Sequence, residues 1–188
     1  MMRKTILAFV VICLAFTALA AGCGSQARQY AQEARSSYIT ARAVLVGVAE
    51  FPAQMEALLR SGPIDSSREE AEELIDGVRD LLPSASSAFR TVSEKAELLK
   101  GEGSDKFTPY AERLLALVNM NEEIINGYIE FVGISDSVLQ GIPYGENPEV
   151  LMPVLNSMDA VILRIQDLSS RLEQMEAETE ALYLDITQ

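Results

Sequence analysis

The chain has 188 residues, no histidine and a formal net charge of −13 at pH 7. Without histidine it lacks histidine general bases, histidine-dependent catalytic triads and most kinds of zinc site. An acidic surface also disfavours nucleic acid, whose phosphates require Lys and Arg. We therefore expect no catalytic residues, no cofactor and no nucleic-acid partner.

The N-terminal segment has the order of a secretory signal. Two basic residues, Arg3 and Lys4, precede an unbroken apolar run over residues 6–16, and small residues follow. A permanent transmembrane helix is the alternative, but Thr17 interrupts the stretch, which is short against the ~20 residues that a span needs. The sequence therefore predicts that residues 1–22 are a signal peptide.

The stretch LAAGCGS at residues 19–25 resembles the lipobox of bacterial lipoproteins, in which small residues precede an acylated cysteine that becomes the new N-terminus. It departs from the commonest form, because Ala20 stands where leucine is usual. The resemblance implies a diacylglyceryl thioether on Cys23 that anchors the chain to a membrane. Cys13 lies in the segment to be removed, so Cys23 would have no partner for a disulfide. If the source has two membranes, Gly24 implies the outer one; otherwise the lipid lies in the cell membrane.

The remaining chain, residues 23–188, reads as one all-α domain. Loop-forming stretches break it three times, and between them apolar residues recur at the three-four spacing of coiled-coil helices. Proline after Thr108 and after Asn147 indicates two helix starts. Short connections require antiparallel neighbours, which predicts an up-down-up-down four-helix bundle. The expected helices are about 25–60, 66–100, 108–140 and 148–186.

The expected helices have apolar seams and contain internal prolines. The apolar seam of the first helix includes Pro52, and that of the second includes Leu74 and Leu81. Pro52, Pro83 and Pro153 fall inside expected helices, where each removes a backbone hydrogen bond and bends the helix. We interpret the bends as curvature around the core, with signalling hinges as the functional alternative.

Charged residues form two patterns. Arg28, Arg35 and Arg42 recur every seven residues along the first helix, level in an antiparallel bundle with Glu173, Glu176 and Glu180. Ion pairing inside the bundle is the expectation, and a docking site for an acidic partner is the alternative. The second pattern is an acidic group at the start of the second helix, Glu69, Glu70, Glu72, Glu73 and Asp76. It could attract a divalent cation, but acids there also complement the helix dipole, and we assign no metal.

Three polar or aromatic residues fall on the inner face of the third helix. Asn121 and Ser135 occupy seam positions that would otherwise be apolar, and Tyr128 lies between them. A buried asparagine in such a seam usually fixes the register of the helices. The functional alternative is a polar pocket between helices with Tyr128 as one wall.

The loop after the third helix offers a candidate partner contact. Ile142 and Tyr144 lie at the end of the bundle far from the predicted anchor, where exposed apolar side chains would suit a protein interface. Folding back onto the core is the equal alternative. The sequence thus predicts a membrane-anchored extracytoplasmic lipoprotein, a non-catalytic bundle acting through protein contacts. The alternative is a bundle that senses or binds a small ligand, and the oligomeric state stays open.

Overall fold

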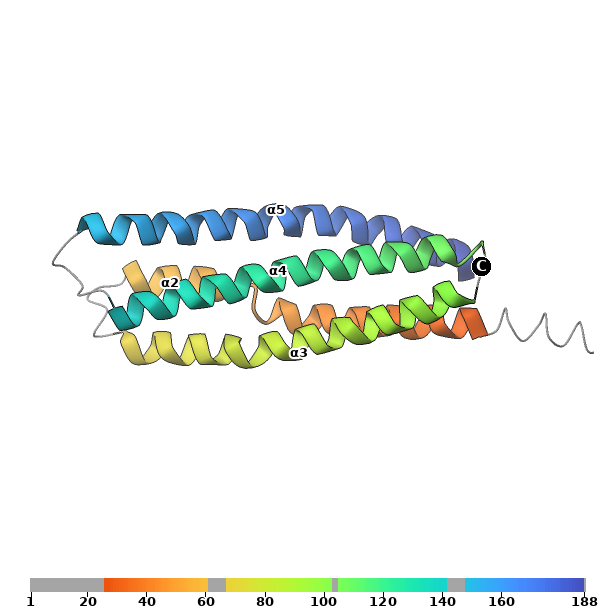
Figure 1. The fold of residues 1–188 in the computed structure, drawn as a ribbon, viewed down its shortest axis with the longest axis horizontal. Coiled ribbons are helices and arrows are strands. Elements are labelled where there is room, and N and C mark those ends of the chain that lie inside the picture. The colour runs from red at the N-terminus through yellow and green to blue at the C-terminus, as the bar shows by residue number, and fades with distance from the viewer. Residues whose placement is uncertain (1–25, 61–66, 103–104, 142–147, 188) are drawn as a thin grey trace, which may run out of the picture.

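The computed structural model describes residues 26–60, 67–102, 105–141 and 148–187, and within these ranges every regular element is a helix (Figure 1). The elements in chain order are a helix over 26–46, α2 (Phe51–Arg60), α3 (Arg68–Gly101), α4 (Thr108–Gly141) and α5 (Pro148–Thr187). The expected all-α helical bundle is confirmed. The starts of α4 and α5 also fit the proline signals at Pro109 and Pro148.

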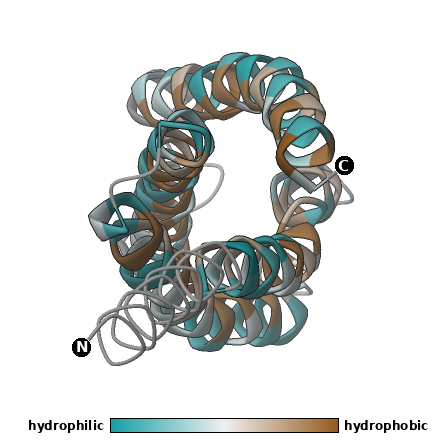
Figure 2. Cartoon of the chain, turned by 90° about the vertical axis from the view of Figure 1, so that its right-hand side faces the viewer, coloured by the Kyte–Doolittle hydropathy of each residue, from teal (hydrophilic) through white to brown (hydrophobic). Residues whose placement is uncertain are grey.

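The long helices lie side by side along one axis (Figure 1). The start of the 26–46 helix, the end of α3, the start of α4 and the end of α5 share one end of the bundle, so the chain runs up, down, up and down. Seen from that end, each helix carries both hydrophobic and hydrophilic residues around its circumference (Figure 2). This amphipathic pattern is what a helix with one buried face requires.

The first arm of the bundle is two helices, so the single helix expected over 25–60 is wrong. Residues 47–50 form a turn. Proline has no N–H, so Pro52 cannot donate to the carbonyl of Val48 four residues earlier. That carbonyl instead accepts from the N–H of Phe51 at 3.1 Å. The turn also moves the buried seam from Pro52, which is half-buried, to Phe51, which is 2% exposed.

The seam of α3 differs from the expected one at two places. Ile75 and Leu82 are buried, whereas Leu74 is half-buried and Leu81 is exposed. The observed seam keeps a regular four-three alternation from Ala71 to the end of the helix. At each of these places two apolar residues are adjacent in the sequence. The second of them continues the four-three alternation, and it is the one that is buried. Pro83 lies inside α3 and Pro153 inside α5, as expected.

α4 is the central packing element. One row of side chains from Leu114 to Leu139, which includes Asn121, Tyr128 and Ser135, is buried throughout, and a second row at Leu117, Ile124, Phe131 and Val138 is buried as well. Close approach to α5 depends on Gly127, because a Cβ there would stand 2.7 Å from the Cγ1 atom of Ile165. A helix with two buried rows of side chains can pack against neighbouring helices on two sides.

The inner face of the 26–46 helix is made mostly of alanine. Ala27, Ala31, Ala34 and Ala41 are all at most 2% exposed, and the large exceptions are Tyr38 and Leu45. Contact with α3 is close: the Tyr38 and Phe89 rings meet edge-on at 6.0 Å, and Lys95 forms an ion pair with Glu33. Apart from Tyr38, other residues of this helix border α5, and they line the site described below.

Across the described ranges, none of the helices combines the length and the apolar character that crossing a membrane would demand.

Candidate functional site

A cleft opens between the 26–46 helix and α5, with α4 as its floor. Its cavity volume is about 520 Å³, within the range typical of small-molecule sites. We call it the Tyr38 cleft, after the tyrosine that lines it. Most of its lining is apolar and comes from all three helices, namely Ile39, Ala43, Val46, Leu114, Leu117 and Ala177.

Two ion pairs cross the cleft and join the arm to α5. The Arg35 guanidinium binds Glu180 through two hydrogen bonds, of 2.8 and 2.9 Å. Two helical turns further along, the Arg42 Nε donates to the Glu176 Oε1 at 2.7 Å. The expected pairing inside the bundle is therefore confirmed for Arg35 and Arg42. All four side chains keep partial contact with solvent, so each pair contributes little stability.

A buried hydrogen-bond chain leads from the cleft into the core. The Tyr38 hydroxyl donates to the Glu176 Oε1 at 2.6 Å and accepts from the Asn121 Nδ2 at 3.2 Å. The same Nδ2 donates to the Leu117 carbonyl at 2.8 Å. The Asn121 Oδ1 has no partner although the residue is fully buried. Asn121 thus ties α4 to the arm, as expected of a residue that sets register, and leaves one acceptor unpaired beside the cleft floor.

Aromatic rings surround the Arg35 end of the cleft. The Arg35 Cζ lies 4.8 Å from the centre of the Tyr183 ring, and the Tyr183 and Tyr110 rings are 5.6 Å apart. A guanidinium over an aromatic face gains a cation–π contact in addition to its ion pair. Arg35 is therefore held from one side by a carboxylate and from another by a ring.

Burial changes the pKa values of tyrosines in the bundle. It raises the pKa of Tyr38, and the adjoining Glu176 carboxylate raises it further. Burial likewise raises the pKa of Tyr110, with the neighbouring Tyr183 adding to the shift, and burial raises the pKa of Tyr128. In each case the apolar surroundings disfavour the phenolate.

Tyr128 lines a second hollow, of about 430 Å³, between α5 and the segment formed by the 47–50 turn and α2. Asn121 and Ser135 do not line it. Ser135 is buried and its Oγ donates to the Phe131 carbonyl at 2.8 Å, within α4. The structure thus separates the three residues that the sequence grouped on one face: Asn121 bonds to the arm, Tyr128 faces a hollow and Ser135 bonds to its own helix.

The remaining candidates fall outside the described residues or carry no site. Cys23, Ile142 and Tyr144 lie outside the described residues. Of the acidic group, Glu69 and Glu70 lie in the first turn of α3, where they complement the helix dipole. In the described part of the chain, no cluster of three or more acidic, cysteine or histidine side chains is arranged to hold a metal ion.

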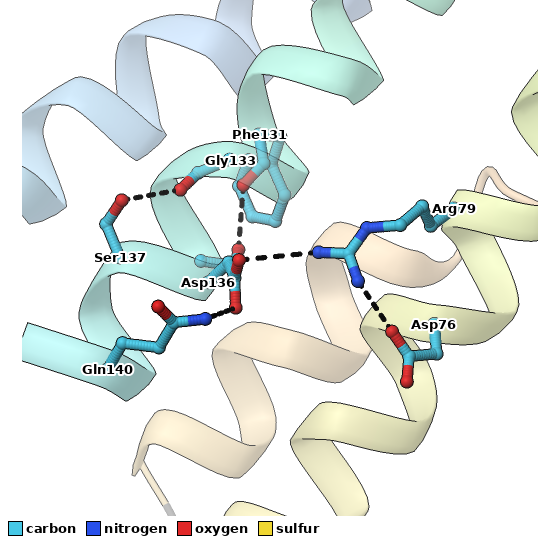
Figure 3. Close-up of polar contacts among 8 residues, drawn as sticks. Asp76, Arg79, Phe131, Gly133, Asp136, Ser137 and Gln140 are labelled. Carbon is cyan, nitrogen blue, oxygen red and sulfur yellow. Dashed lines mark hydrogen bonds and ion pairs between the residues drawn. The ribbon is translucent and has the colours of Figure 1, made fainter.

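A polar cluster joins α3 to α4 away from the cleft (Figure 3). The Arg79 guanidinium binds Asp76 on its own helix at 2.6 Å and reaches Asp136 of α4 at 3.4 Å. Gln140 donates to the other oxygen of Asp136 at 2.8 Å. These side chains are mostly exposed, so the cluster acts as a surface link between two helices.

Sequence reasoning missed the cleft and three of the residues around it, Tyr110, Leu117 and Tyr183. The available signal was the arginine repeat at 28, 35 and 42. Arg35 and Arg42 line the cleft, and long charged side chains that recur every seven residues indicate a helix edge bridged by polar side chains.

The raised pKa values of Tyr38, Tyr110 and Tyr128 predict that the folded chain loses stability at alkaline pH. From about pH 10 upward the unfolded chain loses phenolic protons that the folded chain keeps, so the free energy of unfolding falls with pH. Each such tyrosine contributes a slope of at most about 1.4 kcal/mol per pH unit. In Tyr38→Phe we expect a shallower slope than in the wild type, measured by urea unfolding at pH 9 to 11.5. Parallel curves would contradict the assignment, because lysine titration is common to both proteins.

Comparisons with protein-family models, with curated proteins and with solved structures found no match for this chain. Its function has to be inferred from the chemistry of its own residues.

Proposed function

We propose that this chain is a lipid-anchored, extracytoplasmic protein of the cell envelope that acts by binding and not by catalysis. The Tyr38 cleft is its ligand-binding site. The cleft carries this proposal, because a volume of about 520 Å³ with apolar walls and a few fixed polar groups is the usual form of a small-molecule site.

The location rests on the N-terminal sequence. Basic residues, an apolar run and LAAGCGS follow one another in the order of a lipoprotein signal, and Cys23 is the residue to be acylated. Two acyl chains suffice for stable attachment to a bilayer. In the bundle, the start of the 26–46 helix lies at the same end as the end of α3, the start of α4 and the end of α5. The cleft would therefore face the aqueous space within a few helical turns of the membrane surface.

Binding without catalysis is supported by the groups that the cleft offers. The ionisable side chains around it are paired with one another: Arg35 with Glu180, and Arg42 and Tyr38 with Glu176. Tyr38 holds its proton more tightly than a free tyrosine does, so it is a poor general acid near neutral pH. The chain contains no histidine to take that role.

Contact with a protein partner is the second candidate function. The observation in its favour is the exposure of two large apolar side chains, Ile39 (52%) and Val46 (62%), which lie seven residues apart on one face of the 26–46 helix. Apolar side chains grouped on a surface are typical of protein interfaces. Ile142 and Tyr144, which lie outside the described residues, remain candidate contacts.

The anchor predicts a defined N-terminus. Mass spectrometry of the protein from its native membrane should find a chain that begins at Cys23 and carries the added mass of acyl groups. Cys23→Ser should abolish both the added mass and the membrane attachment. Recovery of an intact, unmodified chain of residues 1–188 would contradict the lipoprotein assignment.

Crosslinking in the native cell tests what the bundle binds. A photoreactive amino acid is placed at Ile39 on the cleft rim, at Tyr144, and at the exposed control position Asp167 of α5. Ligand binding predicts a small-molecule mass added at position 39 and not at 167. A protein-sized adduct at 39 or at 144, without a small-molecule mass at 39, would favour the second candidate. Equal labelling at all three positions, or none, would contradict both.

A further inference from the structure

We propose that the ligand of the Tyr38 cleft is a hydrophobic organic cation, an ammonium or guanidinium group on an apolar body. In the free protein, the Arg35 side chain occupies the position of the cationic group. This inference rests on the proposed ligand-binding function and names the chemical class of the ligand.

The cation position is defined by what surrounds the Arg35 guanidinium. Glu180 binds it through two hydrogen bonds, and the Tyr183 ring lies under it at 4.8 Å, with the Tyr110 ring adjoining. A carboxylate combined with aromatic faces is the usual protein environment for an organic cation. The fold therefore already contains such an environment, filled by a side chain of its own.

The apolar body has a matching surface next to that position. Leu114 and Leu117 continue the floor of the cleft from Tyr110 toward Asn121, and Ile39 and Val46 stand exposed at its rim. Leu114 and Leu117 are already buried, but covering Ile39 and Val46 would remove apolar surface from water, which favours binding by roughly 25 cal/mol for each Å² buried. An ion without an apolar body would leave this surface exposed.

The balance of charge favours a cation over an anion. The chain carries a net charge of −13, which attracts cations and repels anions over the whole surface. An anion would also have to displace Glu180 from Arg35, and a glutamate has a short side chain that stays close to its helix. Both side chains are partly exposed, but that of Arg35 is longer and can move its charge into water. A cationic ligand can thus take over Glu180 while Arg35 becomes solvated.

Because Arg35 and a cationic ligand would compete for Glu180, removing Arg35 and removing the charge of Glu180 should change the affinity for the ligand in opposite directions. The full mature chain is reconstituted in nanodiscs of uncharged-headgroup lipid and titrated calorimetrically with three probes that share one apolar body: 4-phenylbutylamine, 4-phenylbutanol and 4-phenylbutanoate. Empty nanodiscs correct for partitioning into lipid. Arg171→Ala is the matched control, because Arg171 is an exposed arginine of α5 that pairs with Asp167 outside the cleft.

We expect the amine to bind more tightly than the alcohol, and the carboxylate to bind least. Arg35→Ala should tighten amine binding several-fold, since the competing guanidinium is gone, whereas Arg171→Ala should change it less than twofold. Glu180→Gln should weaken amine binding about tenfold. Circular dichroism checks that each variant keeps its helix content, which removal of a half-exposed ion pair should not alter.

Two results would overturn the inference. If the carboxylate binds best and Arg35→Ala abolishes its binding, the cleft takes anions, and the ligand-binding function stands with a different ligand class. If no probe binds to the wild type or to Arg35→Ala, the cleft does not take hydrophobic cations. The crosslinking at Ile39 then decides separately whether the cleft binds a ligand at all.

Discussion

The ion pairing between the 26–46 helix and α5 is the interaction on which the site depends. Arg35 binds Glu180 and Arg42 binds Glu176, and all four side chains line the cleft. The buried alanines of the same helix do not line it. Long polar side chains therefore bridge the two helices at this seam.

The seam between the arm and α5 differs from the packing of the other helices. α3, α4 and α5 pack through rows of large apolar residues, whereas the arm reaches α5 through Arg35–Glu180 and Arg42–Glu176. Half-exposed ion pairs contribute little net free energy and can exchange partners with a charged ligand at small cost. The same feature that makes this seam weak thus makes it suitable for binding. Asn121 links α4 to the arm there, because its amide donates to the Tyr38 hydroxyl.

Much of the fold could be predicted from the sequence. The heptad spacing and the prolines after Thr108 and Asn147 gave the all-α bundle and two helix starts to the residue, because both signals are local. The pairing of Arg35 and Arg42 with α5 also followed, since an antiparallel bundle fixes which heptads lie level. Pro52 was misjudged because a proline in an apolar seam can bend a helix or end it, and here Phe51 takes the buried place.

The site itself could not be predicted in the same way. A cleft is the volume that side chains leave unfilled, so it depends on how three helices rotate and approach one another. Leu114 and Leu117 look like any core leucines in the sequence, and nothing local distinguishes them as a cleft floor. Tyr183 was likewise unremarked, because its contact with Arg35 joins two ends of the chain.

The central claim is that the 26–46 helix is the weakly held element of the bundle, and native-state hydrogen exchange tests it most directly. We predict that amides of the 26–46 helix open at a lower free energy than those of α4, since ion pairs and alanine methyl groups hold the first and two apolar rows hold the second. Glu176→Gln should accelerate exchange in the 26–46 helix and leave α4 unchanged. Equal protection of the two helices, unaffected by Glu176→Gln, would contradict the account.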